Sequence, residues 1–255
     1  MRKGQITIFI ILAAVLITSA IFIFYVRTSI KKVSPKQEEQ YQTNSVKNSA
    51  DFFTKSCIDK VLKESLDKLG ENGGYIYKNP NLKIQYTQDY IFTFLYIDRA
   101  NFLPSIDSVK FQIEKYINEN LRYCIDDFVF YEQQGWSIKI PKVKSNITMG
   151  ENEVIASIEF PVNFIRDKTT FSLDKFFTIN NVPLKKILEG ANGILNDAEK
   201  AQKEVDEHNA PEIPLQSFTK NDLLFLNYQY PDTGRFLWII KEKEYEFFFA
   251  INLEI

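Results

Sequence analysis

Histidine and cysteine are scarce in this chain of 255 residues, which contains one His and two Cys. Cys57 and Cys124 form no Cys-x-x-Cys pair, so one chain cannot assemble a zinc site of the usual Cys/His kind. A catalytic thiol would need a base, and only His208 is available, within a polar connector. The sequence therefore predicts no metal site, no cofactor and no catalytic residue.

Phosphate-binding loops, nucleophile elbows and long basic tracts are missing too. Gly190 and Gly193 have neither the order nor the lysine of a phosphate loop, and no Gly-x-Ser-x-Gly occurs. The net charge is −2 and the pI is near 5.7, whereas nucleic-acid binding needs clustered Lys and Arg. Nucleic acid is excluded as a partner. An envelope hydrolase whose site converges only in three dimensions stays open as an alternative.

Apolar and aromatic side chains, in contrast, are plentiful: 45% of residues are hydrophobic, with 22 Phe and 13 Tyr. This composition excludes disorder across the main body. The longest apolar run covers 6–26 and holds no charged residue. A helix of about twenty residues crosses a hydrocarbon core about 30 Å thick. The run predicts a single transmembrane helix over 6–26, after a basic leader at 1–5 and before a polar stalk at 27–44.

The start of the chain carries a family resemblance. Arg2-Lys3-Gly4-Gln5-Ile6-Thr7, directly followed by the apolar run, resembles the class III signal peptide of archaeal type IV pilin-like proteins. In that family a prepilin-type peptidase cuts after the glycine, so the resemblance implies cleavage between Gly4 and Gln5. Pilins that polymerise usually carry glutamate five residues into the mature chain. Phe9 occupies that position here, a departure that bears on filament building and not on processing or simple anchoring.

A second resemblance covers about half of the chain. The KGQITIF start, the segment SCIDKVLKESLDKLGENGGYI and the helix end NENLRYC are similar to uncharacterised membrane proteins of small-genome archaea. This likeness implies lineage and location, and no activity.

The direction of insertion has two opposed indicators. Two basic residues precede the apolar run and four follow it within 27–36, which alone would place the body in the cytoplasm. The pilin-like leader predicts the opposite side. We favour a cell-membrane protein with an extracytoplasmic main domain, and a cytoplasm-facing anchored adaptor stays open. The expected partners are the lipid bilayer, a prepilin-type peptidase and other envelope proteins.

Residues 45–255 form the predicted main domain, with a sub-boundary near 125. Apolar positions three and four apart predict helices over 45–69, 105–123 and 184–205. Cys57 and Cys124 lie on the inner stripes of the first two helices. A disulfide between them would stabilise the domain, and the alternative is two reduced, buried cysteines.

Strand patterns complete the predicted α+β fold, an antiparallel meander. The run 90–98 is apolar on both faces, as in a central strand, whereas 153–164 alternates as in a sheet with one wet side. Trp136 and Trp238 are interpreted as core residues rather than as a binding face. The remaining predicted strands are 75–77, 82–86, 128–131, 136–140, 143–148, 171–179, 224–230, 235–240 and 245–253.

One sequon, Asn146-Ile147-Thr148, is a candidate N-glycosylation site, although a chance sequon is common in a chain of this length. Taken together, these features predict a non-catalytic pilin-like or cell-envelope protein with a role in structure, adhesion or assembly. The envelope hydrolase and the anchored adaptor are the alternatives.

Overall fold

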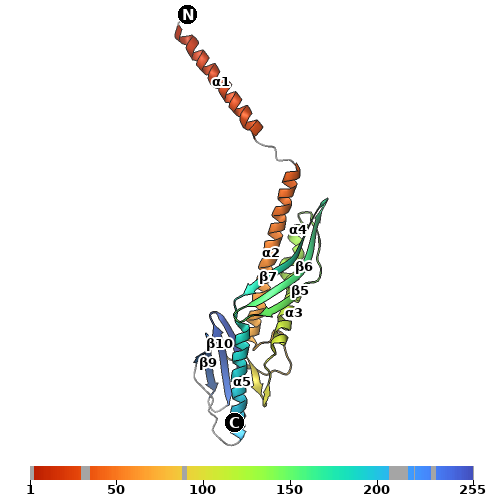
Figure 1. Cartoon of the computed structure of the whole chain (residues 1–255), viewed down its shortest axis with the longest axis vertical. Helices are drawn as coiled ribbons and strands as arrows, with labels where there is room; N and C mark the ends of the chain where they lie inside the picture. The colour runs from red at the N-terminus through yellow and green to blue at the C-terminus, as the bar shows by residue number, and fades with distance from the viewer. Residues whose placement is uncertain are drawn as a thin grey trace. The chain divides into compact units, whose positions relative to one another are not determined.

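Figure 1 shows the chain as a computed structural model, which describes residues 3–29, 35–87, 91–206, 218–220, 222–230 and 234–254. The chain divides into two compact units, Met1–Val46 and Lys47–Ile255. The fold is α+β, with one long helix in the first unit and two β-sheets with their helices in the second.

The first unit contains α1 (Lys3–Ser29) and the beginning of α2 (Pro35–Glu71). Within the described residues, no helix combines the length and apolar character that crossing a membrane requires. The predicted transmembrane helix over 6–26 is therefore wrong, and so are the single-pass topology and the membrane localisation inferred from it.

The long helices of the second unit follow the apolar periodicity. α3 (Ile106–Ile125) begins after Ser105, whose Oγ accepts a hydrogen bond from the Ser108 N–H at 3.2 Å. α5 (Leu184–Asp206) agrees with the prediction for 184–205. α2 differs, because it begins at Pro35, inside the predicted stalk. Proline is tolerated in the first turn of a helix, so Pro35 starts this helix instead of interrupting it.

The larger sheet has seven strands in the order β1-β2-β11-β10-β9-β8, with β3 paired to β2. Every pair is antiparallel except β2 with β11, which run parallel, so the predicted antiparallel meander is wrong here. Parallel neighbours need a long crossover, and the chain builds α3, the smaller sheet and α5 between them. The strands are β1 (Ile84–Tyr86), β2 (Ile91–Ile97), β3 (Ala100–Asn101), β8 (Phe218–Lys220), β9 (Leu223–Tyr230), β10 (Arg235–Glu242) and β11 (Tyr245–Asn252).

The smaller sheet is built around β6 (Val154–Arg166). β7 (Thr169–Asn180) pairs along one edge of β6, while β5 (Lys144–Met149) and β4 (Ser137–Lys139) share the other edge. The predicted hairpin of 143–148 with 153–164 is confirmed as β5–β6. On β6 the predicted inner face is buried as well: Val154, Ala156, Ile158, Phe160, Val162 and Phe164.

The predicted hairpin between 128–131 and 136–140 is wrong. Asp126, Asp127 and Phe128 all have positive φ, so the chain turns sharply through a short 3₁₀ segment, η1 (Asp126–Phe128), into α4 (Val129–Glu132). The Phe128 ring is buried against Phe164, with the ring centroids 5.1 Å apart. The apolar run at 128–131 therefore reflects packing of Phe128 and Tyr131 onto Phe164 of β6 rather than strand pairing.

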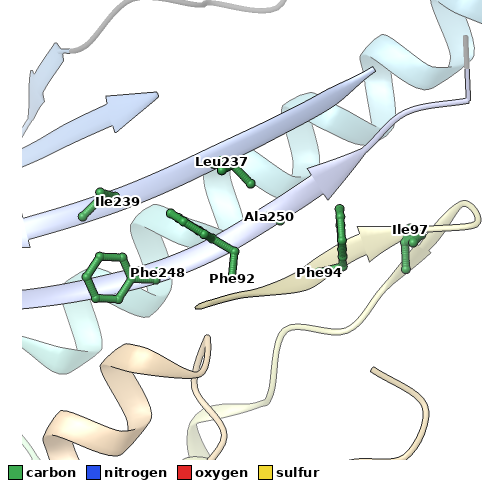
Figure 2. Packing of buried hydrophobic residues seen from close by; sticks show 7 residues of the cluster. All are labelled: Phe92, Phe94, Ile97, Leu237, Ile239, Phe248 and Ala250. Atoms are coloured by element: carbon green, nitrogen blue, oxygen red, sulfur yellow. The ribbon is translucent and has the colours of Figure 1, made fainter. Parts of the chain in front are cut away.

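Buried side chains cover both faces of the central strands of the larger sheet. Figure 2 shows the cluster on one face, with α5 behind the strands; it comprises Phe92, Phe94, Ile97, Leu237, Ile239, Phe248 and Ala250. On the other face α5 approaches closely, because a Cβ added at Gly190 would lie 3.0 Å from the Phe225 ring. The prediction that 90–98 forms a central strand is confirmed for β2, which lies between β1 and β11.

Candidate functional site

A groove lined by tyrosines lies where α2 ends and the following loop meets β1 and β2. Its volume is about 580 Å³, which falls within the roughly 300–1,000 Å³ of small-molecule sites. Its walls come mainly from 72–86. We call it the tyrosine groove; the side chains used below are those of Asn72, Tyr75, Tyr77, Asn79, Pro80 and Tyr86.

The loop that forms the groove leaves α2 through two glycines. Gly73 and Gly74 have φ of +62° and +91°, and a Cβ at Gly74 would lie 2.7 Å from Pro104. Beyond the glycines the loop backbone is held by one buried amide, that of Gln112 on α3. Its Nε2 donates to the Gly74 carbonyl at 3.2 Å, and its Oε1 accepts from the Ile76 N–H at 2.9 Å. Gln112 thus substitutes for a neighbouring strand and fixes the loop.

The first two tyrosines are tied down by their hydroxyls. Tyr75 donates to the Phe102 carbonyl at 2.6 Å, and Tyr77 donates to Glu119 Oε2 at 2.8 Å. The Lys115 ammonium lies 4.1 Å from the centroid of the Tyr77 ring, a cation–π contact. Burial raises the pKa of Tyr77, and the hydrogen bond to Glu119 raises it further, so the phenol stays protonated and donating at neutral pH.

The remaining wall is an ordered turn and an exposed ring. Asn79 Oδ1 accepts from the Asn81 N–H at 3.1 Å, and the Asn79 carbonyl accepts from the Leu82 N–H at 3.1 Å, which fixes the turn around Pro80. Tyr86, on the edge strand β1, is 68% exposed. The groove therefore combines aromatic faces with amides that both donate and accept, which suits a ligand with an apolar face and hydroxyl groups.

A second hollow of about 460 Å³ lies beside the later part of α2 and the β10–β11 turn. Carboxylates gather there, among them Asp67, Glu242 and Glu244, together with Lys63 and Lys243. Burial raises the pKa of Asp67, and Lys63 opposes that rise. The hydrolase alternative would need His208 at such a site, and His208 lies outside the described residues.

The structure joins Cys57 of α2 to Cys124 of α3 as a disulfide, with the Cα atoms 5.6 Å apart. Neither thiol is therefore free for catalysis or metal binding. Among the described residues, no group of three or more His, Cys, Asp or Glu side chains is placed to hold a metal ion. The bridge connects the two helices whose apolar stripes carry the cysteines.

The other predicted site residues lie apart from the groove. Asn146 and Thr148 are exposed on the same face of β5, while Ile147 between them is buried. Gly4 and Gln5 fall in the first turns of α1, and their side-chain surroundings lie outside the described part. Both tryptophans are buried, as predicted for core residues.

Sequence reasoning missed the groove and its anchor. Gln112 lies on the inner stripe of α3 with Val109 and Ile113, and it is buried as they are. A polar residue on an apolar stripe is the signal that could have marked it, because a buried amide needs hydrogen-bond partners. Its partners are backbone groups of the loop at 74–76, and nothing in the sequence indicates that this loop lies beside α3.

α1 presents a different kind of surface. Exposed apolar side chains occupy consecutive positions, Val15–Ile17 and Ile21–Val26, and successive residues point about 100° apart around a helix. The apolar surface of α1 therefore surrounds the helix instead of forming one stripe.

In comparisons with protein-family models, curated proteins and solved structures, nothing matches this chain. Function is therefore inferred from the chain's own residues.

Proposed function

We propose that the protein is a non-catalytic, pilin-like assembly subunit in which α1 of one copy packs against α1 of other copies. The observation that carries the proposal is the apolar surface around the whole circumference of α1. An exposed apolar area of this kind marks an interaction site, since its contact with water is unfavourable. One neighbouring helix covers one side only, so several copies are needed to cover α1.

The second unit supports a structural role for the remainder of the chain. It has its own buried core on two sheets, and the Cys57–Cys124 disulfide stabilises it in an oxidising environment. Such a domain can fold in each copy independently of the packing of α1.

Assembly is tested on the full chain by sedimentation velocity in aqueous buffer. The wild type is expected to form discrete multi-copy species. Leu16→Glu places a charge at a position 65% exposed on α1 and should release single copies. Phe111→Glu is the matched control, because Phe111 is 64% exposed on α3, and it should leave the assemblies unchanged. A wild type that sediments as single copies overturns the proposal.

Processing of the leader belongs to the same proposal. We expect a prepilin-type peptidase to cleave between Gly4 and Gln5, with Gln5 as the new first residue. Intact-mass measurement after co-expression with such a peptidase should show the loss of Met1–Gly4. Gly4→Val should block that loss, and an unchanged wild-type mass would exclude cleavage at this bond.

Asn146 is the proposed glycosylation site. Its side chain and that of Thr148 lie on one exposed strand face, which leaves both accessible to a transferase. In a host that glycosylates secreted proteins, Thr148→Ala should abolish the glycan mass and Thr148→Ser should retain it. If the wild type carries no glycan in such a host, Asn146 is not a glycosylation site.

A further inference from the structure

The tyrosine groove is a preformed site rather than a gap between mobile side chains. Gln112 fixes the backbone on both sides of Tyr75, and the hydroxyls of Tyr75 and Tyr77 are bound to α3 and to the segment before it. Because these groups are already ordered, a ligand would not have to pay their ordering entropy on binding. This wall of the groove is therefore ordered before any ligand binds.

The charge of the lining selects against an ionic ligand. Lys78 is the only charged side chain among the described residues that line the groove. Lys115 and Glu119 are not among the lining residues, and both are engaged with Tyr77. A phosphate or carboxylate group would need clustered donors and positive charge, so the lining favours a neutral ligand.

The remaining chemistry matches one neutral class. A sugar ring has an apolar face of C–H groups, which packs on an aromatic ring, and a rim of hydroxyls that donate and accept hydrogen bonds. Tyr86 offers an exposed ring, and Asn72 and Asn79 bring amides to the same groove. Asn72 Nδ2 donates one hydrogen to the Lys68 carbonyl and Asn79 Oδ1 accepts from the Asn81 N–H, but an amide has two N–H hydrogens and two oxygen lone pairs, so each has capacity beyond these bonds. A peptide added as a strand is less suited, because β1 provides only three residues for pairing.

We propose that the tyrosine groove binds a neutral saccharide, with the sugar ring stacked on Tyr86 and its hydroxyls bonded to the asparagine amides. This gives the protein an adhesive function in addition to assembly. It does not depend on the packing of α1, because every residue of the groove belongs to the Lys47–Ile255 unit.

The test is saturation-transfer NMR on the full chain, with maltotriose, cellotriose and chitotriose as probes. At least one trisaccharide should receive saturation, with a dissociation constant on the order of 1 mM. Tyr86→Ala should weaken that binding about tenfold or more, since it removes the stacking ring. Tyr123→Ala is the matched control: Tyr123 is 82% exposed on α3 and lies outside the groove, so its loss should not change binding.

Three results would overturn the proposal. These are no saturation of any of the three sugars, equal binding by wild type and Tyr86→Ala, or a proline-rich peptide that binds through Tyr86 while the sugars do not. Leu16→Glu separates the two proposals. This variant should bind the sugar as the wild type does whether or not it assembles, so loss of assembly and loss of sugar binding are scored independently.

Discussion

The two sheets of the main unit differ in how many of their faces are covered. In the larger sheet β11 is buried along nearly its whole length, from Phe247 to Ile251, whereas in the smaller sheet β6 buries every second residue. α5 and the cluster in Figure 2 cover opposite faces of the first, while the outer face of the second remains exposed, including Phe177 and Ile179 of β7. The period of hydrophobicity along a strand therefore reports the number of covered faces.

The largest expected effect is a loss of stability that differs between the two sheets. Phe249→Ala removes a fully buried ring of β11 that stacks on Trp238, and it should lower the free energy of unfolding by about 3–5 kcal/mol. The same change at Phe177, which is 65% exposed on β7, should stay within about 0.5 kcal/mol. Urea unfolding of both variants measures this. Equal losses would contradict the assignment of covered and uncovered faces.

The disulfide connects the helices that serve the two sheets. The end of α2 approaches the larger sheet at Gly70, where an added Cβ would clash with the Glu246 carbonyl of β11, while α3 packs beside β5 of the smaller one. Replacing Cys57 and Cys124 by Ala should lower the free energy of unfolding by about 2–5 kcal/mol, because the long loop between them becomes unrestrained in the unfolded chain.

Thermal unfolding with and without reductant offers a second measurement of the bridge. The wild type should lose stability on reduction, and the double variant should not respond. A wild type that is insensitive to reductant would contradict a stabilising role for the bridge.

Tyr245, at the start of β11, should make stability depend on alkaline pH. Burial raises its pKa far above the usual value of 10.0, and its hydroxyl donates to the Leu66 carbonyl at 3.0 Å. Above pH 10 the unfolded chain loses this proton while the folded chain keeps it. The stabilisation from Tyr245 is thus complete below pH 10 and is lost as the pH rises further.

Tyr245→Phe isolates this contribution. Above pH 10 the free energy of unfolding should fall less steeply for the variant than for the wild type, by up to about 1.4 kcal/mol per pH unit. At neutral pH the variant should be about 1 kcal/mol less stable, since the Leu66 carbonyl loses its donor. Parallel pH profiles for the two proteins would show that the buried phenol does not control the dependence.

The smallest predicted effect concerns the edge of the smaller sheet. Glu114 of α3 accepts the Ile147 N–H of β5 at 2.9 Å, a backbone donor on the side of the strand away from β6. Glu114→Ala should cost about 1 kcal/mol, whereas Glu114→Gln keeps an acceptor and should cost less. Amide hydrogen exchange at Ile147 should become faster in Glu114→Ala only. If the Ile147 amide stays protected in both variants, contacts other than Glu114 protect this edge of the sheet.

Local patterns predicted the regular elements well and the irregular ones poorly. The 3.6-residue period located α3 and α5, and Ser105 caps the start of α3. The apolar run at 128–131 was wrongly predicted to be a strand. Phe128 has left-handed backbone angles and packs on Phe164, so its burial does not require a strand. Parallel pairing of β2 with β11 was not predictable either, since no local signal joins segments so far apart in the chain.

The candidate sites also differ in how far local sequence patterns could predict them. The Cys57–Cys124 pairing could be raised as one of two alternatives because both residues lie on apolar stripes, and the exposure of Asn146 follows from the alternation of β5. The tyrosine groove could not be predicted, because its shape depends on Gln112 reaching a loop 36 and more residues away in the chain.

The sequence by itself determined the apolar run of α1, the amphipathic helices and the difference between strands with one and two buried faces. These are local periodicities, and each follows from where successive side chains point along a helix or a strand. Only the tertiary structure decided which strands pair, which cysteines meet and how Gln112 shapes the groove. Those outcomes depend on contacts between distant segments, whose geometry is set by packing rather than by any short stretch of chain.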